Sequence, residues 1–331
     1  MSLVFFPCCV ASAFVDHAQV AARLVVDKLG VEIKDGSEFN CCGYPYKGID
    51  FKAFILLSGR NLALAEMNGA DLVTTCGCCY GTTKQAESIL KHDVSLSDYV
   101  NNALKREGLA YKGKSTVKHL VEVLLANPGI ANLKARLDGT QRGLRVATHY
   151  GCKLLRPNDV VGFDSPFSPS RFDQLIEATG AVAVPWSEKL ECCGAPLIGI
   201  NDATSVHLAK KKLVSARQAK ADLICTACPC CYLQFERTRE SLIFEYETAQ
   251  GVVVPRFKFD RAKMALTFES VVDFNVPSLA YVQVIGLALG LDETALGVGG
   301  IKLTHGLLPP CHEGGGMRLR AVETAGRGLS V

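Results

Sequence analysis

Cys192-Cys193-Gly194-Ala195-Pro196 has a twin in Cys41-Cys42-Gly43-Tyr44-Pro45, and each stretch stands in the middle of a longer cysteine array. The first array reads Cys9, 31 residues, Cys41-Cys42, 33 residues, and then Cys76-Gly77-Cys78-Cys79. The second reads Cys152, 39 residues, Cys192-Cys193, 34 residues, and then Cys228-Pro229-Cys230-Cys231. A duplication explains this agreement at once, so the sequence predicts two homologous halves.

The residues that lead into the last cysteines of each array are repeated as well. Ala70-Asp71-Leu72-Val73 precedes the first of these groups and Ala221-Asp222-Leu223-Ile224 precedes the second, with one extra residue in the second copy. We therefore divide the chain into a first cysteine-rich domain at 1–143, a second at 144–303, and a glycine-rich tail at 304–331.

Length and composition agree with this division. The 331 residues suit two domains of about 150 residues, each large enough to bury a core. Hydrophobic residues make up 48% and charged residues 21%, which is typical of a globular protein. The net charge is +3, and no cluster of lysine and arginine is interleaved with aromatic residues. Nucleic acids and anionic membranes are therefore poor candidates for partners.

Fifteen cysteines in one chain need a chemical explanation. The first residues, Met1 to Pro7, contain neither a basic region nor an apolar stretch long enough for a signal peptide, so we expect a cytoplasmic protein without a disulfide framework. In a reducing compartment, clustered thiols indicate metal or redox chemistry. The longest apolar segment, Val276 to Leu291, contains Gln283 and is too short to span a bilayer, so we expect a buried or partner-docking helix.

Alternation of strands and helices predicts an α/β fold with two pseudo-symmetric, Rossmann-like halves and parallel sheets. In the first half we expect strands at 3–6, 31–33 and 72–74, and helices at 15–29 and 51–67. Residues 84–137 have a polar helical pattern with a break at Asn127-Pro128-Gly129, and Asp138-Gly139 marks a turn. The cysteines follow the strands, and the carboxyl ends of parallel strands are the usual place for a site.

The second half repeats this order. We expect strands at 144–148, 182–184 and 222–224, helices at 172–179 and 207–219, and an added loop at 164–170. Residues 241–264 have no counterpart in the first half. Within them, residues 252–255 suggest an edge strand, because Pro255 lacks a ladder donor. From Thr304 onward we expect a poorly ordered tail.

Ten cysteines form two equivalent sets of five, which are Cys9, Cys41, Cys42, Cys76 and Cys79, and Cys152, Cys192, Cys193, Cys228 and Cys231. Thiolates gathered without histidine or carboxylate partners select zinc, copper(I) or iron–sulfur clusters. A structural zinc takes four ligands, and so does an ordinary cubane cluster. Five thiolates with a vicinal pair favour a more open iron–sulfur unit in which one sulfur bridges two irons. Two zinc sites that only hold the halves together are the alternative.

The doubled pattern C-x(31–39)-C-C-x(33–34)-C-x-x-C resembles the cysteine-rich CCG domain family typified by the B-type subunit of heterodisulfide reductase. The resemblance covers about residues 3–303 and includes Lys28 to Glu32, His149 to Cys152, Cys228 to Cys231 and Phe274 to Pro277. Similar domains occur in glycolate oxidase, quinone-linked dehydrogenase and lactate-utilisation proteins. The pattern is therefore more specific for the domain than for the subunit.

The resemblance implies that each set of five cysteines holds a noncubane [4Fe-4S] cluster and that the two clusters face each other across a pseudo-twofold interface. It also implies a disulfide substrate between them, cleaved with one electron from each side. For a methanogen, the resemblance implies that this substrate is the coenzyme M–coenzyme B heterodisulfide. Disulfide reduction consumes two electrons, which two matched one-electron centres supply.

The sequence contains no Gly-x-Gly-x-x-Gly turn and no P-loop lysine, so electrons must arrive from other subunits. The resemblance implies two of them, a ferredoxin-like iron–sulfur protein of the C type and a flavin-bearing protein of the A type. We expect a catalytic oxidoreductase subunit that acts on a disulfide. The alternatives are an iron–sulfur electron-transfer subunit of a quinone-linked dehydrogenase and a zinc-stabilised interaction module.

Some candidate residues lie outside the two sets. The further cysteines are Cys8, Cys78, Cys225, Cys230 and Cys311. Cys8 could replace Cys9, although the family's spacing to Gly30 favours Cys9. We interpret Cys78, Cys225 and Cys230 as small buried side chains or as sulfurs near a cluster. Cys225 could also pair with Cys228, but the duplicated register favours Cys228 with Cys231.

Two histidines and three basic residues complete the candidates. His149 lies three residues before Cys152 and could give a proton to a departing thiolate, or it could be a hydrogen-bonding histidine beside the cluster. His17 has the same two interpretations with less support. Lys47, Lys153 and Arg156 could contact an anionic disulfide, or they could be solvated surface charges.

Overall fold

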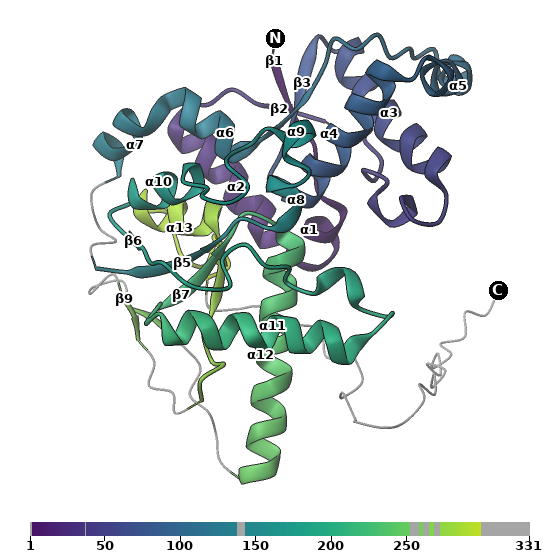
Figure 1. Cartoon of the computed structure of the whole chain (residues 1–331). Helices are drawn as coiled ribbons and strands as arrows, with labels where there is room; N and C mark the ends of the chain where they lie inside the picture. The colour runs from purple at the N-terminus through teal and green to yellow at the C-terminus, as the bar shows by residue number, and fades with distance from the viewer. Residues whose placement is uncertain are drawn as a thin grey trace, which may run out of the picture.

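Two parallel four-stranded sheets organise the chain, with helices packed around them (Figure 1). The computed structural model describes residues 2–36, 38–137, 143–251, 258–260, 265–267 and 272–298. The first sheet has the order β2 (Lys34–Asp35), β1 (Ser2–Phe5), β3 (Ala70–Thr74) and β4 (Val117–His119). The second, read from the matching edge, has β6 (Val182–Ala183), β5 (Arg145–His149), β7 (Leu223–Thr226) and β10 (Ser278–Ala280). The predicted α/β fold with two repeated halves is confirmed.

Helices follow the strands in the same order in both halves. Those of the first half are α1 (Cys9–Phe14), α2 (Asp16–Leu29), α3 (Phe51–Met67), α4 (Gly77–His92), α5 (Val94–Leu104), α6 (Leu120–Leu124) and α7 (Ile130–Arg136). Those of the second are α8 (Cys152–Leu155), α9 (Asn158–Val161), α10 (Arg171–Glu177), α11 (Asp202–Gln218), α12 (Pro229–Gln250) and α13 (Tyr281–Ala288). Short 3-10 helices lie at Tyr44–Tyr46, Lys105–Glu107 and Ala195–Leu197, and a π-helical turn lies at Leu125–Gly129. Residues Lys258–Asp260 and Ala265–Thr267 pair as the antiparallel ribbon of β8 and β9.

Helices α3 and α11, which occupy equivalent places in the repeat, begin with the same kind of cap. The side chain of Asp50 accepts a hydrogen bond from Ala53 N at 3.0 Å, and that of Asn201 accepts one from Thr204 N at 3.0 Å. Such a side chain satisfies an N–H group that has no partner inside the helix, which stabilises the helix by about 1 kcal/mol. The local sequence therefore fixes where both helices begin.

The two halves pack on each other reciprocally. Helix α4 of the first half packs against α8 of the second, and α12 of the second packs against α1 of the first. Because α1 corresponds to α8 and α4 to α12, these contacts are related by an approximate twofold axis. The buried Tyr80 on α4 crosses the interface and donates a hydrogen bond to the main-chain oxygen of Val161 at 3.0 Å. One continuous hydrophobic core runs through both halves.

The contact between α4 and α8 depends on Gly81. A Cβ at this position would lie 2.1 Å from the main-chain oxygen of Lys153. An alanine inside an exposed helix is about 1 kcal/mol more favourable than glycine. We nevertheless expect Gly81→Ala to lower the free energy of unfolding by about 1–3 kcal/mol, because the methyl group overpacks the interface. Urea denaturation would measure this change.

Gly48 provides the matched control, since a Cβ there would meet nothing within 4 Å. Gly48→Ala is expected to change the free energy of unfolding by no more than about 0.5 kcal/mol. A Gly81→Ala protein as stable as the unaltered chain would show that the two halves are not held in the described packing.

Several predicted elements need correction. The strand expected at 31–33 is displaced to Lys34–Asp35, and residues 84–137 contain the strand β4 in addition to helices. The apolar segment 276–291 is a buried strand, β10, followed by the buried helix α13, and not one helix. Because β10 and α13 correspond to β4 and α6, the repeat also extends beyond residue 264. The predicted break at Asn127 is confirmed by its extended backbone.

Other predictions stay open. The turn at Asp138-Gly139, the edge strand at residues 252–255 and the tail from Thr304 lie outside the described residues. The domain boundary between residues 143 and 144 also stays a prediction.

Candidate metal centre

Four helix N-termini carry the cysteines at the two ends of each array. Cys9 is the first residue of α1 and Cys152 is the first residue of α8, each shortly after a central strand. Cys76 and Cys228 are the residues that cap α4 and α12, after β3 and β7. The free N–H groups of a helix N-terminus stabilise the negative charge of a thiolate. The fold therefore gathers thiols at the carboxyl ends of four parallel strands.

The two vicinal pairs lie on loops that require glycine. Gly43 and Gly194 have φ angles of 85° and 86°, a conformation that glycine adopts without strain. A Cβ on Gly194 would also lie 2.5 Å from the main-chain oxygen of Ser205, and one on Gly43 would lie 2.9 Å from that of Phe54. The following helix thus presses directly on each glycine, and this close approach fixes the position of the vicinal cysteines.

All five cysteines of the first set are brought together. The Sγ atoms of Cys9 and Cys41 are 3.9 Å apart. The thiol of Cys42 contacts those of Cys41 and Cys79, and Cys79 contacts Cys76. Hydrogen bonds from Cys42 and Cys9 hold the pKa of Cys41 well below its usual range. Cys9 is exposed, whereas Cys42, Cys76 and Cys79 are buried.

The second set has the same arrangement. The thiol of Cys192 contacts those of Cys152 and Cys193, and hydrogen bonds from both hold its pKa well below the usual range. Cys193 contacts Cys231, and Cys231 contacts Cys228. In each half, therefore, the thiolate form is favoured at the first cysteine of the vicinal pair. Hydrogen bonds from other thiols also hold the pKa of Cys228 and that of Cys8 well below the usual range.

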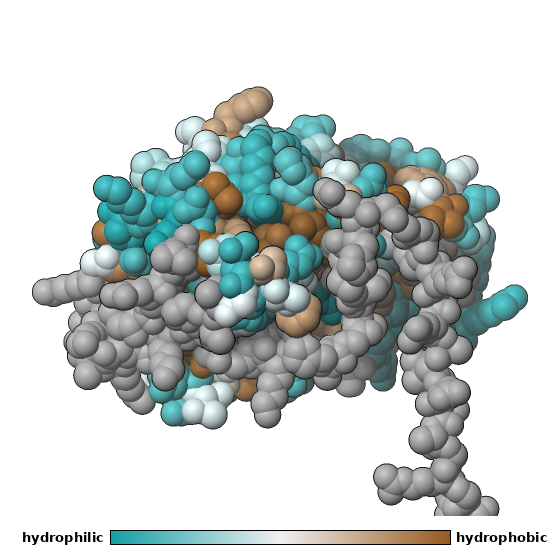
Figure 2. All heavy atoms as spheres, turned by 90° about the horizontal axis from the view of Figure 1, so that it is seen from below, coloured by the Kyte–Doolittle hydropathy of each residue, from teal (hydrophilic) through white to brown (hydrophobic). Residues whose placement is uncertain are grey.

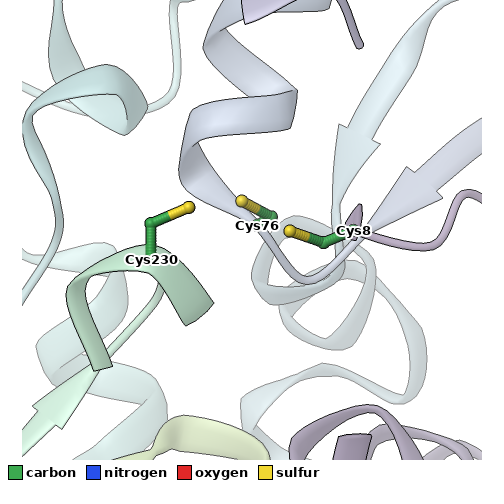
Figure 3. Close-up of side chains that lie close together, drawn as sticks. All are labelled: Cys8, Cys76 and Cys230. Atoms are coloured by element: carbon green, nitrogen blue, oxygen red, sulfur yellow. The ribbon is translucent and has the colours of Figure 1, made fainter. Parts of the chain in front are cut away.

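The two sets meet at the interface between the halves. The Sγ atoms of Cys76 and Cys228 are 3.7 Å apart. Figure 3 shows the side chains of Cys8, Cys76 and Cys230 pointing toward one another from the start of α1, α4 and α12, and their sulfur atoms all lie within 4.8 Å of one another. The thiols of both halves thus form one continuous group rather than two remote sites.

Cys8 and Cys230 are the residues that sequence reasoning left outside the site. Cys8 is the residue before α1, and Gly151 stands in the equivalent place before α8. When the two halves are aligned in this way, Cys9 is the counterpart of Cys152. The thiol of Cys8 lies beside Cys76 and Cys230 at the interface between the halves. The Cys-x-Cys-Cys pattern, which is present in both arrays, was the available signal for Cys230.

His149 lies beside the second set. One ring nitrogen of His149 and the sulfur atoms of Cys193 and Cys231 lie within 4.8 Å of one another. The imidazole is fully buried, with its centroid 5.1 Å from that of Phe235 and 6.5 Å from that of Trp186. Burial holds the pKa of His149 well below its usual value, which favours the neutral imidazole. Its role as a proton donor stays a prediction.

A cavity of about 270 Å³ lies against the second set and is shared by both halves. Its lining includes Val10, Phe14, Tyr44 and Cys78 from the first half, and Cys152, Cys193, Cys228, Cys230 and Cys231 from the second. The cationic side chains in this lining are Lys153 and Arg237. Their charged groups lie 5.5 Å from the ring centroid of Tyr44 and 4.9 Å from that of Phe14. A largely apolar chamber with cations in its wall suits a small organic anion.

The other predicted basic residues are engaged elsewhere. Lys47 donates a hydrogen bond to Gln85, and Arg156 donates one to the main-chain oxygen of Leu190. Neither lines the cavity, whereas Lys153 does.

The remaining candidates fall outside the thiol group. His17 Nε2 lies 3.0 Å from the hydroxyl of Tyr232. Cys225 is buried in β7, where burial alone raises the pKa of its thiol. Cys311 lies outside the described residues.

The residues present fit a group that prefers sulfur ligands. Most of the clustered thiols are buried, and a buried thiolate needs a compensating positive charge. Soft thiolates provide this environment for an iron–sulfur cluster or for zinc, and carboxylates are absent from the two ligand groups found among the described residues. The chemistry of the donor set therefore supports metal binding by both halves.

The cysteine-rich domain known as CCG matches the chain twice, at residues 3–84 and at residues 146–236. The chain belongs to the CCG cysteine-rich domain family. It is 33% identical, over 300 residues, to the B-type subunit of the ferredoxin/F(420)H(2)-dependent CoB-CoM heterodisulfide reductase of Methanosarcina acetivorans, and the match covers 89% of this chain and 92% of that protein. This match confirms the predicted resemblance.

Two other relatives carry names that point to different complexes. A protein of Archaeoglobus profundus, named for its likeness to the heterodisulfide reductase B-type subunit, is 31% identical over 294 residues, covering 86% of this chain and 89% of that protein. The 8-methylmenaquinol:fumarate reductase membrane anchor subunit of Wolinella succinogenes is 29% identical over 295 residues, covering 89% of this chain and 94% of that protein. Chains similar to this one therefore carry different names.

A solved structure shares the fold. The crystal structure of a hypothetical protein from Helicobacter pylori superposes with a TM-score of 0.57 at 18% identity, covering 89% of this chain and 50% of that one. At this identity the likeness concerns the architecture alone.

Within the described ranges, no helix has both the length and the apolar character needed to cross a bilayer. Figure 2 shows one face of the molecule, where the described hydrophilic residues in teal are interspersed with smaller hydrophobic areas in brown.

Proposed function

We propose that this chain is the catalytic, B-type subunit of a heterodisulfide reductase-like complex, in which it reduces a disulfide to two thiols. Each set of five cysteines would hold a noncubane [4Fe-4S] cluster, the first set with Cys9 and the second with Cys152 as its opening ligand. The observation that carries the proposal is the meeting of two complete thiol sets, with the Sγ atoms of Cys76 and Cys228 3.7 Å apart. A disulfide in the adjoining cavity, whose lining includes Cys228, would lie against the second set, and the contact between Cys76 and Cys228 would link it to the first.

The reaction consumes one disulfide, two electrons and two protons, and it yields two thiols. When bound, iron–sulfur clusters supply the electrons one at a time. The cavity's apolar walls exclude water from the disulfide, while Lys153 and Arg237 would attract an anionic group of the substrate. The coenzyme M–coenzyme B heterodisulfide, which the name of the Methanosarcina relative mentions, is our candidate substrate.

The electrons would come from partner subunits. We propose a ferredoxin-like iron–sulfur protein of the C type and a flavin-bearing protein of the A type. The name of a relative, which depends on ferredoxin or F(420)H(2), supports an outside source of electrons. A cytoplasmic location and a part in methanogenesis stay predictions.

A second candidate function is electron transfer in a quinone-linked complex. The observation that favours it is the similarity over 89% of this chain to a subunit named for 8-methylmenaquinol:fumarate reductase. In that case the thiol sets would relay electrons and the cavity would not bind a disulfide.

Metal analysis combined with two assays tests the proposal. Anaerobically purified full-length protein is expected to contain about eight iron atoms with matching sulfide and no zinc. Addition of an oxidant and a thiol is expected to give a new EPR signal that depends on the thiol. With a reduced low-potential dye, two thiols should form for each disulfide consumed.

Three other outcomes would contradict the proposal. Zinc in both halves without iron would indicate a structural module, and iron in one half only would indicate a relay. Oxidation of a menaquinol without disulfide reduction would support the quinone-linked function instead.

A further inference from the structure

A buried lysine in the second half stands where the first half has a neutral asparagine. Helices α3 and α11 are equivalent and are each 17 residues long, and Asn61 and Lys212 are the eleventh residues of these helices. Both side chains are 0% exposed. The two positions are therefore the same place in the repeat, with a different charge.

Both side chains hold the residue that precedes the vicinal cysteines. Asn61 Nδ2 donates to the main-chain oxygen of Asn40 at 3.0 Å, and Lys212 Nζ donates to that of Glu191 at 3.0 Å. Asn40 precedes Cys41, and Glu191 precedes Cys192. In the first half an uncharged asparagine thus holds the main chain before the vicinal cysteines. Holding the main chain there therefore does not by itself require a lysine.

The ammonium group of Lys212 is hydrogen-bonded to neutral groups, and the carboxylates of Glu188 and Glu191 act on it from nearby. Its ammonium also donates to the main-chain oxygen of Glu188, and it lies 4.7 Å from the ring centroid of Trp186. Burial lowers the pKa of Lys212 to about 8, whereas the nearby thiols of Cys193 and Cys231 and the carboxylates of Glu188 and Glu191 act to raise it. The ammonium form therefore predominates at neutral pH, close to the second set.

The preceding residue in each helix does not cancel this difference. Arg60 pairs with Glu107 at 2.7 Å, and its counterpart Lys211 pairs with Glu188 at 3.0 Å. Each of these cations has a carboxylate partner. Arg60 also donates to Asn40 Oδ1 at 3.1 Å, but its side chain is 25% exposed, so solvent screens its charge more than that of Lys212. The fully buried cation that distinguishes the two helices at this position is therefore Lys212.

We propose that Lys212 makes the two thiol sites electrically unequal, so that the group held by the second set has the higher reduction potential and takes the first electron. Reduction adds negative charge, which a nearby buried cation stabilises, and solvent screens such a cation weakly. The electron comes from the iron–sulfur partner subunit. Lys212 is a positioning residue that acts through the cluster, and this inference rests on the proposed function, which gives both sets a cluster.

Potentiometric titration of the isolated sites tests the inference. The Cys42→Ser substitution is expected to leave only the second cluster. In that background, EPR would measure the midpoint potential of the second cluster in three proteins, which carry Lys212, Lys212→Asn or Lys212→Arg. We expect Lys212→Asn to lower the potential and Lys212→Arg to restore it. In a Cys193→Ser background, Asn61→Lys is expected to raise the potential of the first cluster.

The possible outcomes separate the inference from the proposed function. If Lys212→Asn retains its iron and the potential is unchanged, Lys212 only holds the loop and the inference is wrong. If Lys212→Asn does not fold, Lys212→Gln provides the same comparison with a longer neutral donor. Absence of iron from the Cys42→Ser protein and from the unaltered chain would overturn the proposed function itself.

Discussion

Replacing Cys193 by serine is expected to remove about half of the bound iron and to reduce disulfide reduction by at least about 100-fold. Cys193 is buried, and its thiol contacts those of Cys192 and Cys231 in the middle of the second set. Even residues that only support a metal ligand contribute about 10–100-fold to affinity or activity. Since the reaction needs two electrons, one remaining cluster does not sustain it.

The measurement is iron and sulfide content, followed by the disulfide assay, on anaerobically purified protein. Cys42→Ser should give the same result through the first half. Cys225→Ser is the matched control, because Cys225 is a buried cysteine in β7 outside the thiol group, and it should retain all of the iron. A Cys193→Ser protein with undiminished iron would show that the second set is not a ligand set.

Replacing Arg239 by alanine is expected to lower the free energy of unfolding by about 3–5 kcal/mol. Arg239 is 3% exposed, and it donates to Glu236 Oε2 at 2.7 Å and to Asn275 Oδ1 at 3.1 Å. Glu236 Oε1 in turn accepts a hydrogen bond from Ser278 N at 2.6 Å. This network ties α12, which begins at the second set, to the start of β10. The substitution would leave the buried carboxylate of Glu236 without its strongest partner.

Chemical denaturation would measure this change, and a double variant provides the internal test. Arg239→Met combined with Glu236→Leu should cost clearly less than Arg239→Ala, because no buried charge is left unpaired. Lys91→Ala, which removes a half-exposed partner of Glu87, should cost no more than about 1 kcal/mol. A small effect of Arg239→Ala would mean that the network does not bear on stability.

Much of the fold could be predicted because its signals are local. The helix at 51–67 has the predicted bounds, since its apolar periodicity and the cap at Asp50 both lie within the segment. The strand β4 was missed because its three residues are strand only by pairing with β3, which is distant in sequence. The continuous apolar run that contains β10 and α13 has no periodicity that would separate a strand from a helix.

Cysteine spacing predicted the grouping of the thiols within each half, because it is repeated in both arrays. That the two groups face each other across the interface was implied by the family resemblance. The contact between Cys76 and Cys228, and the arrival of Cys8 and Cys230 beside it, depend on how α4 and α12 pack across the interface. The difference between Asn61 and Lys212 is visible in the sequence, but its meaning depends on burial.

The reciprocal packing of α4 on α8 and of α12 on α1 has a bearing on ancestry. An interface in which each copy offers the same surface to the other is the isologous contact of a twofold homodimer. A single CCG domain could therefore have paired with itself before its gene was doubled and fused. In such a homodimer every substitution appears twice, and the two sites must remain identical. After fusion the two domains can accumulate different substitutions, so a difference in charge between their two sites can be inherited.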